Sequence, residues 1–286
     1  IEELNNNIKG PDFPTGAEIQ GTGGIRNAYA TGRGKVKVKA VMDVEEIKGK
    51  QRLIVNEIPY MVNKAMLIEQ VANCVKEKKI TGISDIRDES DRDGMRIVIE
   101  LKKDANPTVI INQLYSYTRM RVTFGMNMVA LVNNVPKTLN LKEMVHYFVE
   151  HRREVIKRRT QFDLTKAEER VHILEGLIVA LDNIDQIIQK IKKSTDTAAA
   201  MSMLVADYSL TEPQSKAILE MRLQKLSSLE QDSIRAEHTS LLEVISNLKS
   251  ILDSEDKVSD MIKADLAEIK DSYGDNRRTE ISIGDE

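Results

Sequence analysis

The sequence has few of the residues that build disulfide frameworks, metal cages or membrane spans. Among its 286 residues there is one cysteine, Cys74, and no tryptophan. A single thiol excludes an intrachain disulfide and a zinc site made of several cysteines, so we predict that Cys74 is a small core residue of a helix. No apolar run is long enough to span a membrane, and the amino end shows no signal-peptide pattern. These absences favour a protein of the reducing cytoplasm without a membrane partner.

Patterns for nucleotide and metal chemistry are missing as well. The glycine-rich segments 21–24 and 32–34 lack the lysine and the spacing of a nucleotide-binding loop, so we expect turns there. His146 and His151 lie five residues apart on a predicted helix, with no carboxylate in a ligating register. We therefore predict neither a metal site nor a catalytic site in this chain.

The segment 88–100 resembles a calcium loop in its pattern only. Three acidic residues alternate before Gly94, and Glu100 follows six residues after that glycine. A calcium loop needs a helix on each side, whereas residues 95–101 alternate in the manner of a strand. We expect an acidic turn that leads into a strand; a calcium-regulated protein is the alternative.

The sequence does have an uneven distribution of charge beneath a net charge of −3. Residues 1–160 carry 27 basic and 20 acidic side chains, whereas residues 161–286 carry 15 basic and 25 acidic ones. The first part could therefore face a polyanion that the second part would repel.

The first half of the chain alternates strands with helices. A helix capped by Asn63 and a helix over 107–115 lie between β-rich runs. Strands are expected over 34–41, 52–58, 83–87, 95–101 and 120–132. These strand–helix–strand units predict an α/β sandwich up to about residue 139, with one sheet and helices against it.

From about residue 140 the pattern becomes helical. A helix is predicted over 140–193, interrupted only by Gly176, and its apolar residues recur close to a heptad seam. A second helix is predicted over 230–273 and ends at Gly274. Neither apolar stripe can be left in water, so we expect an antiparallel two-helix coiled coil within one chain. Pairing of two chains along their lengths is the alternative.

The connector over 194–229 is itself predicted to be helical. Thr211 is a good cap with Pro213 just inside the helix start, and this helix is expected to continue to Leu226. Four apolar residues of this tip are too many to bury against two helices. They are Leu219, Met221, Leu223 and Leu226. We predict that they form a dimerisation surface; a local cap that closes the hairpin is the alternative.

A row of basic residues marks the first predicted strand. Arg33, Lys35, Lys37 and Lys39 share one strand face because side chains alternate with a period of two. The lysines are about 7 Å apart, close to the separation of phosphates along one DNA strand. We predict contact with DNA phosphates without sequence readout; an edge strand protected by lysines is the alternative. A second basic run, 152–159, is a solvated helix face or a DNA-facing patch.

Several blocks of the sequence occur in a distinctive order. They are 10–16 (GPDFPTG), 57–65 (EIPYMVNKA), 88–100 (DESDRDGMRIVIE), 124–131 (FGMNMVAL), 172–177 (HILEGL), 214–226 (QSKAILEMRLQKL) and 275–281 (DNRRTEI). In this order they resemble the A subunits of DNA gyrase, which are type IIA topoisomerases. The resemblance covers essentially the whole chain, and the A-type subunit of topoisomerase IV shares most of the blocks.

The resemblance implies an organisation and a set of partners. Residues 1–139 would be the tower domain beside bent gate DNA, 140–193 and 230–274 the coiled-coil arm, 194–229 the exit gate where two subunits meet, and 275–286 a C-terminal tail. The family passes one double-stranded DNA through another. ATP and Mg²⁺ are bound by the partner B subunit of an A2B2 complex, and no cofactor is expected on this chain.

The resemblance also implies that two functional parts of the family are not found in this sequence. The family's nucleophile is a tyrosine of a winged-helix domain that precedes the GPDFP block, and the chain begins nine residues before that block. The tyrosines of the chain, at 29, 60, 115, 117, 147, 208 and 273, do not stand in the Arg-Tyr pattern of that nucleophile. The family's DNA-wrapping carboxyl-terminal domain is not found either. We expect this polypeptide by itself not to cleave DNA.

Together these observations predict an α+β protein, in which an α/β tower-like sheet domain is followed by a long antiparallel coiled coil with a helical dimerisation tip. Its expected work is to support gate DNA and to hold two A subunits together during ATP-dependent strand passage and supercoiling. The alternative is a non-enzymatic coiled-coil scaffold that carries a DNA-binding α/β head.

Overall fold

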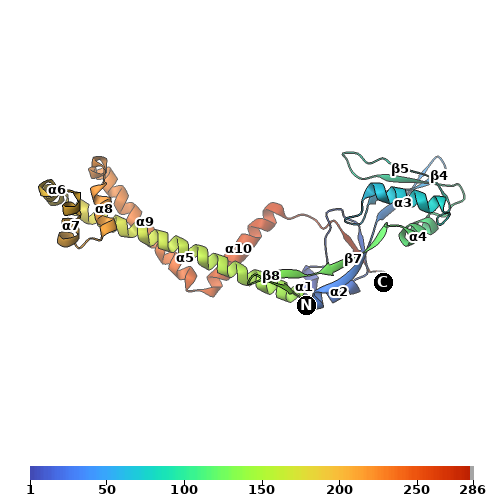
Figure 1. Ribbon diagram of the computed structural model, residues 1–286, viewed down its shortest axis with the longest axis horizontal. Coiled ribbons are helices and arrows are strands. Elements are labelled where there is room, and N and C mark those ends of the chain that lie inside the picture. Colours follow the sequence, from blue (N-terminus) through green and yellow to red (C-terminus); the bar gives the residue numbers. More distant parts are fainter. Residues whose placement is uncertain (284–286) are drawn as a thin grey trace. The chain divides into compact units, whose positions relative to one another are not determined.

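The computed structural model describes residues 1–283 of the chain. They form two compact units, one of residues 1–148 with 274–283 and one of residues 149–273. The first unit contains sheets and short helices, whereas the regular elements of the second are helices (Figure 1). The protein is therefore of mixed helix and sheet, which confirms the α+β class. None of the helices within residues 1–283 is long and apolar enough to cross a membrane.

The first sheet of the first unit, which we call sheet A, has the strand order β10–β1–β2–β7. Its strands are β1 (Glu18–Gln20), β2 (Arg33–Lys39), β7 (Arg121–Asn127) and β10 (Glu280–Ser282). The β1–β10 pair is parallel and the other two pairs are antiparallel. Apolar side chains of one face, among them Val36 and Val38, pack against Phe13 and helix α2 (Gly23–Thr31), with Leu4 of the short helix α1 (Glu2–Asn7) beside them. The core of sheet A therefore lies on the face opposite the basic side chains of β2.

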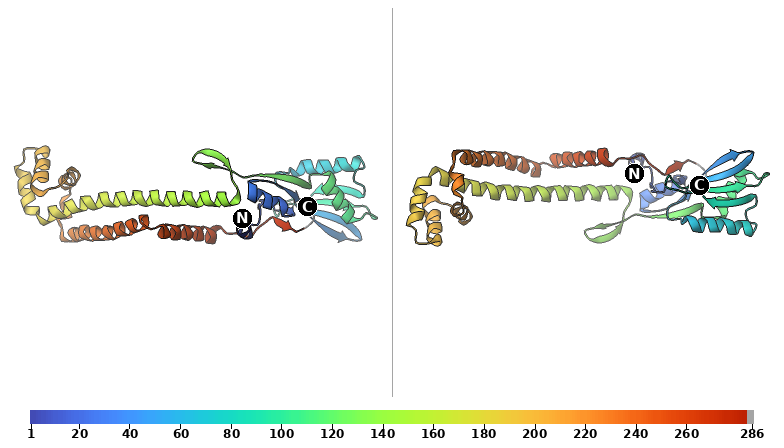
Figure 2. Two further views of the ribbon diagram at one scale, coloured as in Figure 1. Left: turned by 90° about the horizontal axis from the view of Figure 1, so that it is seen from below. Right: turned by 90° about the horizontal axis from the view of Figure 1, so that it is seen from above.

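The second sheet, sheet B, has the order β3–β4–β6–β5. Its strands are β3 (Val41–Ile47), β4 (Lys50–Glu57), β5 (Ile83–Asp88) and β6 (Ile97–Leu101). Helices α3 (Lys64–Lys76) and α4 (Pro107–Tyr117) pack on one of its faces through a cluster that includes Leu53, Ile99 and Leu114 (Figure 2). Asn63 caps α3 by accepting the Met66 amide, as predicted. Cys74 is buried in the same cluster, which confirms its predicted role.

The prediction of a single sheet is wrong. The expected strand 34–41 is divided at Ala40, whose amide bonds to the Met120 carbonyl, so that the chain passes from sheet A into sheet B. The β-rich run 120–132 is divided in the same way into β7 and β8 (Val129–Val132). β8 pairs with β9 (Val135–Thr138) as a separate hairpin (Figure 2). Its turn residues Asn133 and Asn134 have φ of 51° and 63°, the left-handed conformation that such two-residue turns require.

Two sequence blocks from opposite ends of the chain meet in the first unit. The hydroxyl of Thr279, which is fully buried, accepts the Phe13 amide at 2.7 Å and donates to the Gly16 carbonyl at 2.8 Å. The Asp12 carboxylate accepts the amide of Thr279 at 2.8 Å, and Arg277 donates to the carbonyl of Gly10 at 2.9 Å. The segment from 275, predicted only as a tail, thereby contributes strand β10 to sheet A.

The second unit is built on helix α5 (Leu141–Asp182), which begins in the first unit. Helices α9 (Ser228–Leu252) and α10 (Glu255–Tyr273) run along it in the opposite direction (Figure 1). The order of the contacts shows this, because Ile156 packs with Val258 and Leu174 packs with Ile234. The tip between these helices contains α6 (Ile184–Lys193), α7 (Thr197–Tyr208), α8 (Glu212–Leu219) and the 3-10 turn η1 (Leu223–Leu226).

Three details of the helical prediction differ from the structure. The expected helix 140–193 breaks at Asn183, whose side chain donates to the Val179 carbonyl and competes with the helical pattern. The expected helix 230–273 breaks between α9 and α10 at 253–254, where an aspartate and a serine favour helix ends. The tip helix begins as predicted, with Thr211 in a capping box, but it ends at Leu219 and not at Leu226.

Gly176 does not interrupt α5. Its missing side chain makes room for α8, because a Cβ at that position would lie 2.6 Å from the Cβ of Gln214. Gln214 in turn donates to the His172 carbonyl at 2.7 Å and accepts the Thr211 amide at 3.0 Å. The glycine therefore marks the point at which the tip is fastened to α5.

Candidate nucleic-acid interface

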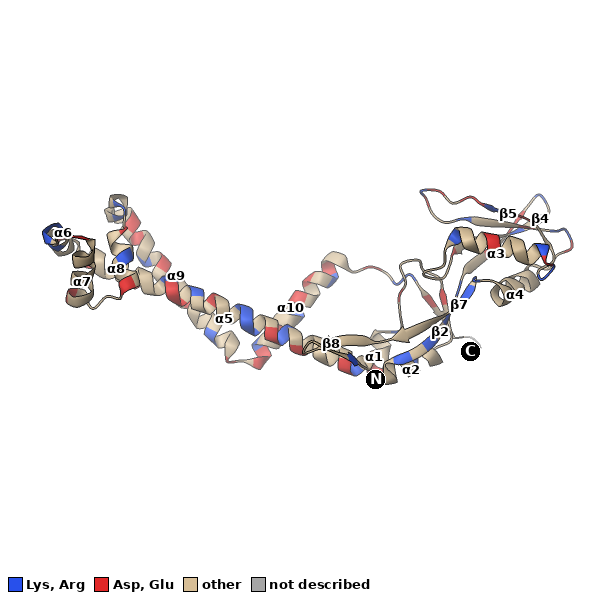
Figure 3. Ribbon diagram, viewed as in Figure 1, with Lys and Arg blue, Asp and Glu red and all other residues tan. Residues whose placement is uncertain are grey.

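The four basic residues predicted to meet DNA lie on one face of β2. Arg33, Lys35 and Lys37 are exposed and Lys39 is half-buried, while Val36 and Val38 point into the core on the other face. Figure 3 shows these basic positions along the ribbon of β2. The predicted alternation along this strand is therefore confirmed; contact with DNA remains a prediction.

β2 is an inner strand of sheet A over part of its length. It pairs with β1 on one side, where Lys37 lies opposite Gln20, and with β7 on the other side along all seven of its residues. Residues 37–39 are therefore paired on both sides. Among residues 1–283, residues 33–36 have a strand partner on the β7 side only, so protection of an unpaired edge stays an alternative explanation for Arg33 and Lys35.

The four basic residues differ in their surroundings. The Lys39 ammonium lies 3.0 Å from the Glu18 carboxylate and 5.9 Å from the centre of the Tyr115 ring. Within residues 1–283 no carboxylate lies within ion-pair distance of Arg33, Lys35 or Lys37. Three of the four predicted contacts are thus available to a polyanion, and the fourth is held inside the protein.

Strand β7 adds residues to this face that sequence reasoning missed. Arg121, Thr123, Gly125 and Asn127 lie opposite Lys39, Lys37, Lys35 and Arg33, respectively. This face of sheet A carries five basic side chains, the four of β2 and Arg121, and two carboxylates, Glu18 and Glu280. Its formal charge is therefore +3. Polar and apolar residues alternate along β7, so the sequence could have shown which of them share a face. Only the pairing with β2 shows that the polar residues lie on the same face as the lysines.

An open hollow of about 650 Å³ adjoins the basic face. It is lined by Gly23, Gly24 and Asn27 of α2, Arg33, Gly34 and Lys35 of β2, and Gly125, Met126 and Asn127 of β7. Two of the lining side chains, Arg33 and Lys35, are basic and have no ion-pair partner among residues 1–283, so an anionic group could approach them there.

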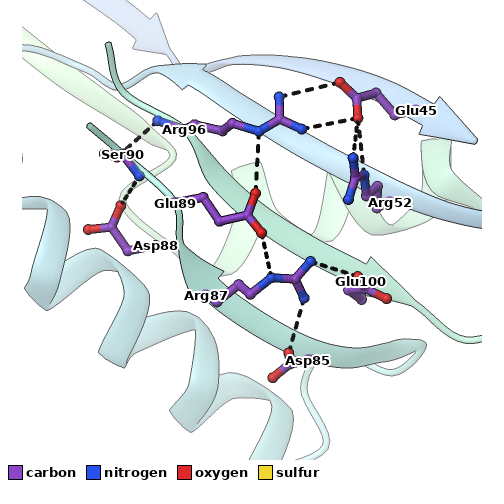
Figure 4. A network of polar contacts seen from close by, with 9 residues as sticks. All are labelled: Glu45, Arg52, Asp85, Arg87, Asp88, Glu89, Ser90, Arg96 and Glu100. Carbon is purple, nitrogen blue, oxygen red and sulfur yellow. Dashed lines mark hydrogen bonds and ion pairs between the residues drawn. The ribbon is translucent and has the colours of Figure 1, made fainter. Parts of the chain in front are cut away.

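Sheet B also carries arginines on the face that its helices leave uncovered, but there they are paired (Figure 4). Arg96 donates to Glu45 at 3.2 Å and to Glu89 at 3.4 Å, and Arg52 donates to Glu45 at 2.9 Å. Arg87 is shared by three carboxylates, with Glu89 at 2.7 Å, Glu100 at 2.9 Å and Asp85 at 3.3 Å. We call these residues the sheet B network.

Glu45 and Glu89 of the sheet B network, and the neighbouring Asp88, have lowered pKa values. The Arg96 guanidinium, followed by that of Arg52, keeps the pKa of Glu45 below its usual range. Hydrogen bonds from Lys64 and then Ser90 lower the pKa of Asp88 to about 2. Glu89, an acidic position of the calcium-like segment, bonds to two arginines, and β6 follows as the predicted strand. No group of three or more metal-ligating side chains occurs in the part of the chain that the structure describes.

The second basic run, 152–159, holds helices together. Arg152 pairs with Asp265 at 3.0 Å, Arg153 pairs with Glu255 at 3.0 Å, and Lys157 pairs with the same Glu255. These bonds join α5 to α10. Most of the run is therefore neutralised, and it is neither a purely solvated face nor a free basic patch.

The four apolar residues predicted for dimerisation come together at the tip of the second unit. All four line a hollow of about 170 Å³ together with isoleucines of α6, among them Ile184 and Ile188. Leu219, Met221 and Leu226 are partly buried in clusters of their own chain, whereas Leu223 is 84% exposed. Leu229, which was not predicted, is 79% exposed nearby in the sequence. Whether this surface joins two chains remains a prediction.

The fold and these two surfaces define the class of the protein: an α+β protein with a basic sheet face and a helical hairpin that ends in an apolar tip. The family model that describes the A subunits of DNA gyrase and topoisomerase IV matches residues 1–267. The chain belongs to this family.

Individual relatives agree with this assignment. The DNA gyrase A subunit of Halalkalibacterium halodurans is 52% identical over 286 residues, which is 100% of this chain and 34% of the relative. The DNA gyrase A subunit of Clostridium acetobutylicum is 53% identical, over 98% of this chain and 34% of the relative. That of Helicobacter pylori is 49% identical with the same two coverages. The chain thus spans about a third of the length of the curated relatives that it matches.

Proposed function

We propose that this chain supports gate DNA on sheet A and joins two copies at the helical tip, as the tower, coiled-coil arm and exit gate of a type IIA topoisomerase. The observation that carries the proposal is the row of Arg33, Lys35 and Lys37. These side chains are exposed, lack ion-pair partners among residues 1–283, and stand on a strand that is paired with β7 along its whole length and with β1 from Lys37 onward. Cations fixed by a rigid sheet suit a polyanion that is gripped by its backbone, because phosphate contacts position DNA without reading its sequence.

The whole enzyme, in this proposal, passes one DNA duplex through another and supercoils DNA. ATP and Mg²⁺ act on the partner B subunit of an A2B2 complex, and this chain binds no cofactor itself. The relatives named above are A subunits of DNA gyrase, which supports this assembly.

The DNA proposal is tested by the affinity of the chain for a duplex of about 30 base pairs at several salt concentrations. Each phosphate contact adds about 0.9 to the slope of log K against log salt. Three contacts therefore predict a slope of about 2.7 in magnitude, with affinity falling as salt rises, equal for duplexes of different sequence. No binding at 50 mM salt, or a strong dependence on sequence, would contradict the proposal.

The chain by itself is proposed not to cleave DNA. Tyr29 and Tyr115 are poor candidates for a nucleophile, because burial is the main cause that raises both pKa values, that of Tyr115 to about 12. The Tyr115 hydroxyl also donates to the Ala40 carbonyl at 2.8 Å. The chain incubated with B subunit, Mg²⁺ and labelled duplex should give no covalent adduct; an adduct would overturn this part.

Self-association at the tip is tested by sedimentation equilibrium with the variant Leu223→Glu, Leu229→Glu. These two side chains are the better targets, because Leu219 is packed inside its own chain and its replacement would disturb the fold. We expect a dimeric parent and a folded monomeric variant.

The matched control is Phe162→Glu, which changes a side chain that is 62% exposed on α5. This variant should remain dimeric. A monomeric Phe162→Glu beside a dimeric tip variant would mean that the long helices pair between chains, as the scaffold alternative requires.

A further inference from the structure

Glycines line the hollow beside the basic face, and packing explains two of them. A Cβ at Gly24 would lie 1.9 Å from the Lys35 carbonyl oxygen, and a Cβ at Gly34 would lie 2.5 Å from the Gly24 carbonyl oxygen. Helix α2 therefore approaches β2 too closely to allow a side chain at either position. These glycines belong to the fold.

Gly125 has no such explanation within the chain. A Cβ at this position would meet nothing within 4 Å among the described residues. Its φ is not among the positive values of the backbone, so an L side chain would fit its conformation. It is exposed in the middle of β7, where glycine weakens a strand because it loses more conformational freedom on folding than other residues. Neither packing nor backbone geometry accounts for the missing side chain.

The neighbours of Gly125 point to what approaches it. Lys35 is its direct partner across the β2–β7 pair, and Thr123 and Asn127 flank it on the same face of the sheet. All three of these side chains are exposed. Gly125 therefore leaves bare backbone between an ammonium group, a hydroxyl and an amide. In strands, such a glycine often marks a place where a ligand or another backbone comes close.

We propose that the sugar–phosphate backbone of DNA lies directly against β7 at Gly125, in a seat bounded by Lys35, Thr123 and Asn127. The ammonium group neutralises the phosphate, and the hydroxyl and amide groups donate hydrogen bonds to its oxygens, which fixes position without reading bases. This inference rests on the proposed DNA binding and adds the location of the strand on the sheet. It also explains why position 125 has no side chain, which the packing of the chain does not explain.

The test is the variant Gly125→Val, assayed as the full 286-residue chain with a duplex of about 30 base pairs. A β-branched side chain suits an exposed strand position, so the melting temperature should be unchanged or higher. If the side chain blocks one phosphate contact, affinity should fall about eightfold at 0.1 M salt and the salt slope by about 0.9. Gly125→Ala should show a smaller loss in the same direction. Ser84→Val, at an exposed position of β5 in sheet B, is the matched control and should bind as the parent does.

The outcomes separate the inference from the function on which it rests. If Gly125→Val binds like the parent while Lys35→Ala, Lys37→Ala binds weakly, the basic face meets DNA but the seat at Gly125 is wrong. If neither variant binds more weakly, the proposed DNA-binding face itself is wrong. A lower melting temperature of Gly125→Val and Gly125→Ala would assign the glycine to folding and would also overturn the inference.

Discussion

Sheets A and B both present basic side chains on the face opposite their apolar cluster, and the two faces differ in how these side chains are paired. On sheet A, Arg33, Lys35 and Lys37 have no carboxylate within ion-pair distance among residues 1–283. On sheet B, Arg52, Arg87 and Arg96 share four carboxylates in one network. The local sequence is rich in charge in both places, and only the second face neutralises itself.

The sheet B network also covers apolar surface. Ile54 and Val98 are 1% and 0% exposed although they point away from α3 and α4, on the same face as Arg52 and Glu100. The long stems of arginine and glutamate can shield such residues while their charged ends stay in water. On sheet A the valines of β2 all point into the core, so its basic side chains have nothing to cover. Pairing with carboxylates, and not charge content, therefore distinguishes the basic face of sheet A from that of sheet B.

The largest effect should come from removing the free charges of sheet A. We expect the variant Lys35→Ala, Lys37→Ala to bind a duplex about 60-fold more weakly at 0.1 M salt, because two contacts of about 0.9 each are lost from the salt slope. The melting temperature should be unchanged, since both side chains are exposed. Fluorescence anisotropy at several salt concentrations measures the effect.

Lys102→Ala, Lys103→Ala removes the same charge from exposed positions after β6 and is the control. Its affinity should stay within about twofold of the parent's, because these lysines lie outside the proposed face. An equal loss in both double variants would mean that net charge, and not the face of sheet A, governs binding.

Removing charges from sheet B should have the opposite result. For Arg87→Ala, Arg96→Ala we expect a lower free energy of unfolding, because the ion pairs of both arginines are removed and the cover of Ile54 and Val98 is lost. Duplex affinity should change by less than about twofold, because these arginines are occupied by carboxylates. Urea unfolding and anisotropy together test this prediction, and a loss of affinity at unchanged stability would contradict the comparison.

The smallest effect should be a dependence of stability on acid. The pKa of Asp88 in the folded protein, about 2, is below its usual value of 3.8, so its contribution is present above that usual value and is lost as pH falls towards 2. The hydrogen bonds of Glu45 and Glu89 to arginine lower their pKa values in the same direction. Parent and Asp88→Asn should therefore differ in melting temperature at pH 6 and converge near pH 2. A constant difference would show that Asp88 does not titrate as proposed.

Local signals in the sequence predict the elements that depend on local physics. Asn63 and Thr211 are identified as caps from residue type alone. Asn63 accepts the Met66 amide, and Thr211 stands in a capping box in which its amide donates to the Gln214 side chain. The alternation of β2 predicts its two faces correctly, because the period of a strand is independent of its partners.

The predictions that failed concern elements and side chains whose surroundings come from distant parts of the sequence. Strands β1 and β10 have three residues each and pair across more than 260 positions of sequence, so no local pattern marks them. The run 152–159 is predicted to face solvent or DNA because its partners on α10 lie about a hundred residues away. For the same reason the sequence does not show that Leu219 is packed inside the tip, whereas Leu229 is exposed.

The central claim is that DNA lies on the face of sheet A. The most direct measurement is the acetylation of every lysine of the chain, quantified by mass spectrometry with and without a saturating duplex at low salt. The account predicts strong protection of Lys35 and Lys37, and unchanged labelling of Lys102, Lys103 and Lys64, the last of which is paired with Asp88. Equal labelling of Lys35 and Lys37 with and without DNA, while the duplex is bound, would contradict the claim.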